Sequence, residues 1–359
     1  MDGIEEYFQQ GRFKDLDDLM HEFLKGKSIT TKIDGAPAIM MWSDFPGLKG
    51  PGVSFKTIVK QTQKGEPRNV FTTEEEIDAF IKEKGYDDDL AAKRGDAFKF
   101  ALKYIAPHVK AGFMLWGDTL FTASTKKING NEVECTPNTL TYKFDTNEFP
   151  EAKAAAIGIC IHSAVNKQFQ MANVDNMKKV MNGKVHDAFI LTLDMVKPEL
   201  KNATKFKKQL DILVKKTQVI QGYFTENIGK ALKKATKKNL DFIETIKADK
   251  KNKSLTDTQI NDIVNCYLAF IQLKEDIVKN CKVNKIKTSL EGNDHDGEGY
   301  VITKNGNALK LVSTEDFTKH NIEHMNKKKI GESVEGDVLK IWSSSKDSNL
   351  FKYFIKKEV

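Results

Sequence analysis

Short segments with lysine and carboxylate side chains recur along the chain at spacings that suit phosphate chemistry. They read TKIDGAP, SFKT, LWGDTLF, GEGYVI and LKLV, at residues 31–37, 54–57, 115–121, 297–302 and 309–312. A neutral lysine amine is a nucleophile, and carboxylates are hard oxygen ligands for Mg²⁺. These residue types suit covalent phosphate chemistry at a lysine, although Lys32 taken alone is interpreted as a solvated lysine at the end of a strand.

Lys32 is the candidate nucleophile. An unperturbed lysine has a pKa near ~10.4, so little neutral amine is present at neutral pH. Cationic neighbours, for which Lys56 and Lys310 are the candidates, would lower that pKa, as would a bound metal. Asp34 lies two residues further on and, in a strand, shares a face with Lys32. Gly35 permits a tight turn or a close approach of the backbone to phosphates.

Three carboxylates, those of Asp34, Asp118 and Glu298, are the candidate ligands for a divalent metal, and the last two also suit ribose hydroxyls. Lys310 is a candidate second catalytic residue. Its charge would neutralise an α-phosphate as pentacoordinate geometry develops, which is usually a large catalytic effect.

In this order the segments resemble the nucleotidyl-transfer motifs shared by ATP-dependent DNA ligases, RNA ligases and mRNA capping enzymes. That superfamily has a KxDG lysine motif, a Ser/Lys or Ser/Arg pair on the next strand, a Gly-acid strand, an EGxV motif and a basic motif. The resemblance implies that ATP, with Mg²⁺ or Mn²⁺, adenylates Lys32. It further implies a nucleotide site made of Lys32, Asp34, Gly35, Lys56, Asp118, Glu298 and Lys310. Where the superfamily places an aromatic residue that stacks on the base, this sequence offers Phe144 or Ile161, and both remain alternatives.

Departures from the superfamily pattern favour an RNA ligase over a DNA ligase. Pro37 stands where DNA ligases and capping enzymes usually have arginine, and the Gly117-Asp118 pair is closer to the Gly-Glu of RNA ligases. Only 46 residues follow residue 313, too few for the OB-fold that those two classes append. Val312 replaces the second lysine of the last motif, for which Lys304 or a lysine of residues 201–290 is a candidate substitute.

The resemblance therefore predicts an ATP-dependent, RNA-type polynucleotide ligase that acts through a lysyl-AMP intermediate. Three alternatives remain open. One is an ATP-dependent DNA ligase. Another is a catalytically degenerate module on the same core, which binds nucleic acid but cannot seal it because of Val312. The third is transfer of the nucleotide to an acceptor that is not a polynucleotide. The chain is also similar to a family of tailed-phage proteins in which KxDG, GD and Lys-x-Val motifs occur together, which implies a viral origin.

The elements that must position these residues alternate between β-rich and helical stretches. Thr73, followed by a Glu-rich turn, predicts a capped helix start. Helices are expected at 4–27 and 74–106 and within 201–290, and strands at 29–42, 52–60, 112–122, 155–163, 299–303 and 308–313. The order predicts an α+β fold, an antiparallel-sheet nucleotidyltransferase core with a Lys-rich helical insertion. The expected division is 1–195 for the first part of the core, 196–290 for the insertion, and 291–359 for core completion and a short tail.

The helical stretch carries the positive charge of the chain. Residues 201–290 contain 20 lysines, no arginine and 9 Asp or Glu, a net +11 against +7 for the whole sequence. One interpretation, which remains open, is that these lysines only keep the outer faces of the helices solvated. The functional reading is contact with the phosphates of a polynucleotide, RNA rather than DNA. Its candidate residues are Lys233, Lys234, Lys237 and Lys238, and a linker is expected near 248–254.

The composition and the apolar runs of the sequence predict where the protein is located. Four cysteines stand far apart without zinc-ligand spacing, which predicts reduced, structural thiols. The N-terminal residues lack the apolar stretch of a signal peptide, and no apolar run approaches the length of a membrane span. The expectation is a soluble cytoplasmic protein, in the host cytoplasm if viral, with no membrane partner.

Overall fold

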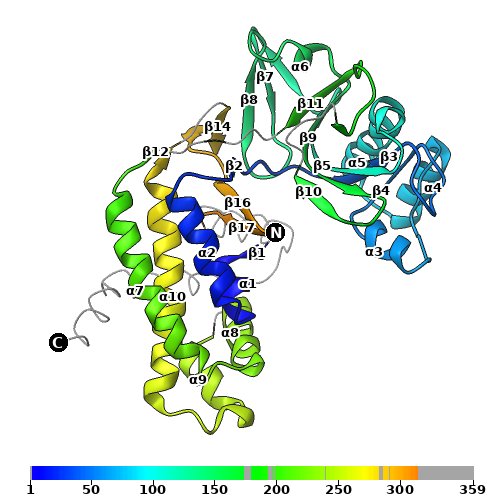
Figure 1. Cartoon of the computed structure of the whole chain (residues 1–359). Coiled ribbons are helices and arrows are strands. Elements are labelled where there is room, and N and C mark those ends of the chain that lie inside the picture. Colours follow the sequence, from blue (N-terminus) through cyan, green and yellow to red (C-terminus); the bar gives the residue numbers. More distant parts are fainter. Residues whose placement is uncertain are drawn as a thin grey trace. The chain divides into compact units, whose positions relative to one another are not determined.

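The computed structural model describes residues 2–173, 179–192, 196, 199–238, 240–282, 286–290 and 292–313. They form two compact units, each described by itself (Figure 1). The helical unit comprises the described residues of Met1–Lys32, Val196–Val283 and Gly299–Val359, and the sheet unit those of Ile33–Met195 and Asn284–Glu298. The chain therefore passes between units inside two of the predicted motifs, after Lys32 and after Glu298. The predicted tail, residues 314–359, lies outside the described residues.

The helices of the helical unit are amphipathic and share one hydrophobic core. They are α1 (Ile4–Gln9), α2 (Phe13–Leu24), α7 (Ala203–Gln221), α8 (Glu226–Lys238), α9 (Phe242–Ala248) and α10 (Asp257–Lys279), with α7 and α10 running alongside each other (Figure 1). The predicted single helix over 4–27 is two helices, because Gly11 takes a left-handed conformation at φ +67° between them. The expected linker near 248–254 is a 3₁₀ turn, Lys250–Asn252, in which Asn252 is buried.

The Lys-rich helices pack directly on the N-terminal helices. Phe8 of α1 contacts Phe224, Tyr267 of α10 and Phe270 of α10. α8 lies close to α1 because its contact residue is Gly229, where any Cβ would overlap the carbonyl oxygen of Gln9. Helices that are about 200 residues apart in the sequence, as α1 and α7 are, thus complete one core.

A four-stranded sheet borders this core, in the order β1 (Asp2–Gly3), β17 (Asn307–Leu311), β16 (Tyr300–Lys304) and β2 (Ile29–Thr31). β1 and β17 are parallel, and the other pairs are antiparallel. Side chains alternate between the two faces of a strand. Those facing the helices are buried, namely Ile29, Tyr300, Ile302, Leu309 and Leu311.

The sheet unit is built on a mainly antiparallel sheet of six strands. The order is β10 (Met171–Asn173), β9 (Ile157–Asn166), β5 (Phe113–Thr122), β3 (Ala38–Trp42) and β4 (Gly52–Ser54), and β11 (Ala188–Thr192) pairs with β9 in parallel. One face packs against α4 (Glu74–Lys84), α5 (Asp88–Phe100) and the turns Ala101–Ile105 and Ala106–His108. The other face packs against Ile58 at the start of α3 (Ile58–Gln63). The strand predicted over 52–60 therefore ends at Ser54, and its last three residues begin a helix.

A second antiparallel sheet completes this unit. Its order is β15 (Asn293–His295), β14 (Lys287–Leu290), β8 (Thr141–Asp145), β7 (Glu132–Cys135) and β6 (Lys127–Asn129). Phe144 of β8 packs edge-on against Phe189 of β11, with ring centroids 5.1 Å apart, and this contact joins the two sheets. A short helix, α6 (Glu151–Ala154), follows β8.

The predicted α+β class agrees with this mixture of helices and mainly antiparallel sheets. The predicted cap is confirmed, because Thr73 Oγ1 accepts from the Glu76 amide at 3.3 Å and the Glu76 carboxylate accepts from the Thr73 amide at 3.2 Å. All four cysteines are buried. Among the described helices, none combines the length and apolarity needed to cross a membrane.

Candidate functional site

The segment after Lys32 is fixed to the strand that carries Asp118. The Ala36 amide donates to the Thr119 carbonyl at 3.0 Å, and the Thr119 amide donates to the Pro37 carbonyl, also at 3.0 Å. A Cβ at Gly35 would overlap the Thr119 carbonyl oxygen and lie 3.1 Å from the Asp118 carbonyl carbon, so only glycine fits this approach. The Asp-Gly of the first predicted segment thus lies directly beside the Gly-Asp of the third.

Tyr142 of β8 joins two of the predicted carboxylate residues. Its hydroxyl accepts a hydrogen bond from the Asp34 amide at 3.1 Å and donates one to Glu298 Oε1 at 2.8 Å. Asn138 Nδ2 donates to Asp34 Oδ2 at 3.2 Å, and Glu298 is only 4% exposed. Burial and the charge of Glu298 raise the pKa of Tyr142 well above its usual value, so the hydroxyl remains a donor. The KxDG and EGxV segments therefore meet through one buried oxygen.

A third group of polar side chains surrounds Trp116 of β5. Lys56 Nζ lies 3.9 Å from the centroid of the Trp116 ring, a cation–π contact, and the His162 ring of β9 packs edge-on at 4.6 Å. His162 Nε2 lies 3.5 Å from Asp118 Oδ1, and these two side chains are only 8% and 14% exposed. The second and third predicted segments thus share an aromatic platform bordered by a cation, an imidazole and a carboxylate.

Lys32 and Lys310 belong to the helical unit. The Lys32 amide donates to the Gly299 carbonyl at 2.8 Å, which extends the pairing of β2 with β16 by one residue. Val301 of β16 pairs with both Thr30 of β2 and Lys310 of β17. By this register both lysines lie on the face of the sheet opposite the helical core. Their strands are two strand spacings apart, about 10 Å across the sheet.

The register also tests Lys304, one of the two predicted replacements for the second motif lysine. Val312 follows Lys310 by two residues, on the same face. Lys304 has the parity of Ile302, which faces the helices, and its Nζ lies 3.3 Å from Glu22 Oε2 of α2. Lys304 is therefore on the opposite face from Lys310, and the prediction that it stands in for the missing cation is wrong.

The predicted metal ligands do not form a preassembled cluster. Within the part of the chain that is described, no three His, Cys, Asp or Glu side chains are gathered to hold a metal ion. Asp34 and Glu298 share Tyr142, whereas Asp118 contacts His162. Mg²⁺ is commonly held by one or two carboxylates together with substrate phosphates.

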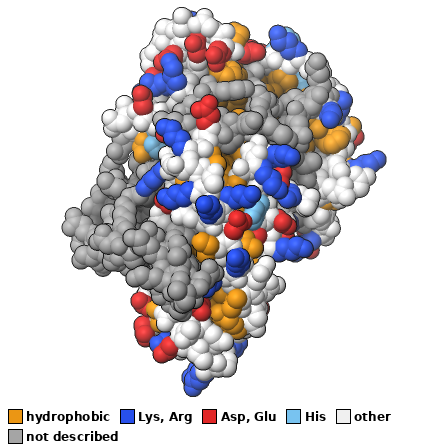
Figure 2. All heavy atoms as spheres, turned by 60° about the vertical axis from the view of Figure 1, so that its left-hand side comes forward, with side chains coloured by type: hydrophobic (Ala, Val, Ile, Leu, Met, Phe, Trp, Pro, Cys, Tyr) orange, Lys and Arg blue, Asp and Glu red, His pale blue; other side chains and the backbone are white. Residues whose placement is uncertain are grey.

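Other predicted site residues have mixed outcomes. Phe144 and Ile161 are both completely buried, so neither presents a surface on which a base can stack. Lys233 and Lys234 are exposed on α8, opposite the buried Ile228 and Leu232. The side chains of Lys237 and Lys238 lie outside the described residues. On the face drawn in Figure 2, Lys and Arg side chains form a band across the middle, with acidic and hydrophobic side chains among them.

The sequence analysis missed or gave no role to three residues of this arrangement, namely Tyr142, Trp116 and His162. Tyr142 lies 108 residues from Asp34 and 156 from Glu298, and no spacing in the sequence indicates that link. Trp116 and His162 stand on adjacent strands, and only the strand pairing brings their rings together. An indicative signal did exist for Trp116, which is two residues from Asp118 and so faces the same way.

Residues 2–220 match the model of a protein family of unknown function, DUF6267, and the chain belongs to that family. The match includes Lys32, Asp34, Lys56 and Asp118 but ends before Glu298 and Lys310. No curated protein matches the chain, and no solved structure does so either.

Proposed function

We propose that this protein is an ATP-dependent nucleotidyltransferase of the polynucleotide ligase type, with Lys32 as the nucleophile. The observation that carries the proposal is the meeting of three motif segments in the sheet unit. Asp34 and Gly35, Asp118, and Glu298 are separated widely in sequence, yet the hydrogen bonds of Tyr142, Ala36 and Thr119 tie them together. A structural role alone gives no reason for KxDG, GD and EGxV to converge.

The proposed first step forms a phosphoramide bond. The neutral Lys32 amine attacks the α-phosphorus of ATP, the bond from that phosphorus to the bridging oxygen breaks, pyrophosphate leaves, and the amine loses its proton to solvent. Lys310, on the same sheet face as Lys32, would stabilise the charge on the α-phosphate. Asp34, Asp118 and Glu298 would bind the nucleotide and its Mg²⁺ or Mn²⁺, and Lys56 its phosphates.

The proposed later steps use a polynucleotide. The AMP group passes from Lys32 to a 5′-phosphate, and a 3′-hydroxyl then attacks that phosphate and releases AMP. Pro37 and the Gly-Asp strand support RNA ends as substrate, and a DNA ligase remains the alternative. Val312 favours a second candidate, a module that binds nucleic acid without sealing it, because Lys304 does not supply the missing cation on the Lys310 face.

Covalent labelling tests the first step directly. The protein is incubated with α-labelled ATP or GTP and Mg²⁺ or Mn²⁺, and label is sought on a denaturing gel. We expect label from ATP, lost in Lys32→Ala and retained in Lys27→Ala, a matched exposed lysine just before β2. Substantial labelling of Lys32→Ala at unchanged thermal stability would overturn the assignment of the nucleophile.

Ligation assays test the later steps. Nicked DNA, nicked RNA and single-stranded RNA with 5′-phosphate ends are compared under the conditions that give label. Sealing of RNA ends is expected. Sealing of DNA nicks alone makes the RNA-type assignment wrong, and labelling without any sealing supports the degenerate module.

A further inference from the structure

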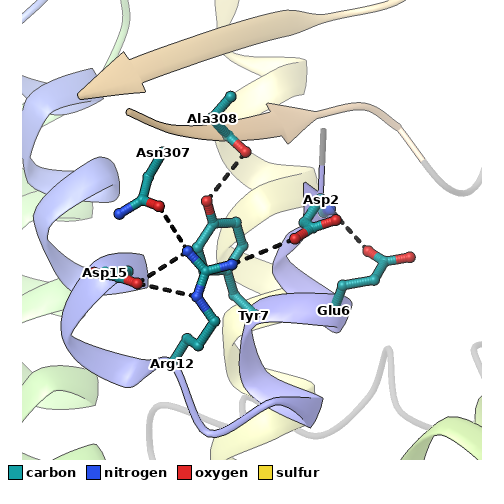
Figure 3. A network of polar contacts seen from close by, with 8 residues as sticks. Asp2, Glu6, Tyr7, Arg12, Asp15, Asn307 and Ala308 are labelled. Carbon is teal, nitrogen blue, oxygen red and sulfur yellow. Dashed lines mark hydrogen bonds and ion pairs between the residues drawn. The ribbon is translucent and has the colours of Figure 1, made fainter. Parts of the chain in front are cut away.

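The N-terminal segment holds the strand that carries Lys310. Asp2 and Gly3 of β1 pair with Leu309 and Lys310 of β17. Figure 3 shows how Arg12 reinforces this pairing: its guanidinium bonds to Asn307 Oδ1 at 2.7 Å and lies 3.4 Å from Asp2 and 3.0 Å from Asp15. In the same view the Tyr7 hydroxyl donates to the Ala308 carbonyl at 3.1 Å. Polar contacts thus fix β17 immediately before Lys310.

Gly3 leaves room for a carboxylate beside the Lys310 side chain. The point that a Cβ of Gly3 would occupy lies 2.8 Å from Glu5 Oε2 and 3.4 Å from Lys310 Cε. Glu5 Oε2 and Lys310 Cε are therefore no more than about 6 Å apart, a range in which opposite charges interact. Glu6 also reaches this point, but its Oε2 accepts from the Gly3 amide at 2.8 Å and so completes the helix start.

The other oxygen of Glu5 is anchored in the helical core. Lys274 of α10, only 4% exposed, places its Nζ 2.8 Å from Glu5 Oε1 and 3.4 Å from Glu275 Oε1. Burial tends to raise the pKa of Glu5, but Lys274 and, more weakly, Lys310 outweigh it and hold that pKa below its usual value. Buried ion pairs seldom add net stability, because desolvation offsets the attraction. A contribution to stability therefore does not explain why the negative charge of Glu5 is held next to Lys310.

We infer that Glu5 is a positioning residue for Lys310: anchored by Lys274, its carboxylate holds the Lys310 side chain in one orientation. This rests on the proposed function, in which Lys310 acts at the α-phosphate. A lysine side chain has many accessible rotamers, so an ammonium group that no partner orients spends most of its time away from the α-phosphate. Misplacement of a catalytic group by about 1 Å can slow a reaction about 100-fold, and for Glu5→Gln we expect a slowing between about 10- and 100-fold.

The test measures the rate of lysyl-AMP formation at several ATP concentrations and pH values. We expect Glu5→Gln to lower the maximal rate with little change in the apparent KM for ATP, and Glu5→Asp to restore part of the rate. In a Lys310→Ala background Glu5→Gln should have no further effect. Glu22→Gln is the matched control, since Glu22 is 15% exposed against 20% for Glu5 and pairs with Lys304 of the same hairpin.

The outcomes separate the two proposals. If the parent protein takes no label, the proposed function fails and this inference fails with it. If the parent is labelled and Glu5→Gln reacts at the parent rate, only the inference is overturned. It is also overturned if Glu5→Gln slows the Lys310→Ala protein by the same factor. Melting temperatures report folding. Since Lys274 anchors Glu5, Lys274→Gln should also lower the maximal rate, and it should have no further effect in the Lys310→Ala background. An equal loss in that background would make the Glu5–Lys274 pair structural and overturn the inference.

Discussion

Replacing Tyr142 with phenylalanine removes a single oxygen from the point where Asp34 and Glu298 meet. That oxygen accepts from the Asp34 amide at 3.1 Å and donates to Glu298 at 2.8 Å. A hydrogen bond to a charged group contributes about 1.5–3 kcal/mol and a neutral one about 0.5–1.5 kcal/mol. Since the ring and its packing remain, we expect Tyr142→Phe to reduce the free energy of unfolding by roughly 2–4 kcal/mol.

A double-mutant cycle in urea measures this link. Unfolding is followed by tryptophan fluorescence for Tyr142→Phe, Glu298→Gln and the double variant, with Tyr86→Phe, a half-buried tyrosine of the same unit, as control. The Tyr142–Glu298 bond predicts that the losses are not additive, with a coupling of about 1–3 kcal/mol. Because the pKa of Tyr142 is raised well above 10, the coupling should be constant between about pH 6 and 9.

The functional side of the same cycle is the rate of covalent labelling. Glu298→Gln should slow it by about 100-fold or more, because the proposed contact with the nucleotide is lost. Tyr142→Phe should slow it less, since Glu298 remains but is released from its position. A stability loss below about 0.5 kcal/mol, the range of neutral surface changes, refutes the reasoning. So do strictly additive losses.

Two further predictions concern the helical unit. Burial raises the pKa of Asp17 to about 7, against the opposing effects of Thr217 and His21. The folded state therefore keeps a proton on Asp17 that the unfolded state loses near pH 4. Because of this difference, the free energy of unfolding should fall as pH rises from about 4 to 7. Asp17→Asn should abolish that fall and be more stable than the parent at pH 8 by roughly 3–4 kcal/mol in urea titrations; an equal fall in the variant contradicts this. Neutralising Lys233 and Lys234 should reduce the slope of log affinity for RNA against log salt concentration by up to about 0.7 per phosphate contact. Covalent self-labelling should survive. The control variant Lys82→Gln/Lys84→Gln on α4 should change neither the slope nor the labelling. An unchanged salt slope would make these lysines a solvated face only, and loss of labelling would place α8 in the nucleotide site.

Much of the secondary structure could be predicted because its signals are local. The periodicity of Leu210, Leu213 and Ile263 indicated α7 and α10, and the Thr73 capping box marked the start of α4. Local signals failed where tertiary packing decides. The β-branched pair at residues 58 and 59 predicted a strand, yet Ile58 begins α3 because its side chain packs against the sheet next to Trp42.

The candidate site could be predicted only in part, for the same reason. Asp34, Asp118 and Glu298 stand in recognisable short motifs, so their residue types were visible in the sequence. Tyr142 stands in no motif, and its importance comes from a sheet register that pairs β8 with β14. The charge count identified residues 201–290 as basic. It gave no sign that the apolar faces of these helices pack on α1 and α2, since composition does not show which helices pack together.

The pairing of β1 with β17 bears on how the chain folds as it is synthesised. Tyr7 and its partner Ala308 are 301 residues apart in the sequence. The sheet that borders the first helices therefore cannot form until almost the whole described chain has been synthesised, which imposes a wait. At about 5–20 residues per second that wait is on the order of 15–60 s. The apolar side chains of Phe8 and Phe13 lack α10 for most of that time and β17 for all of it, which exposes the nascent chain to aggregation. Once β11 has been synthesised, the sheet unit lacks only β14 and β15 among its described strands, so we expect it to fold first and the N-terminus to be placed last.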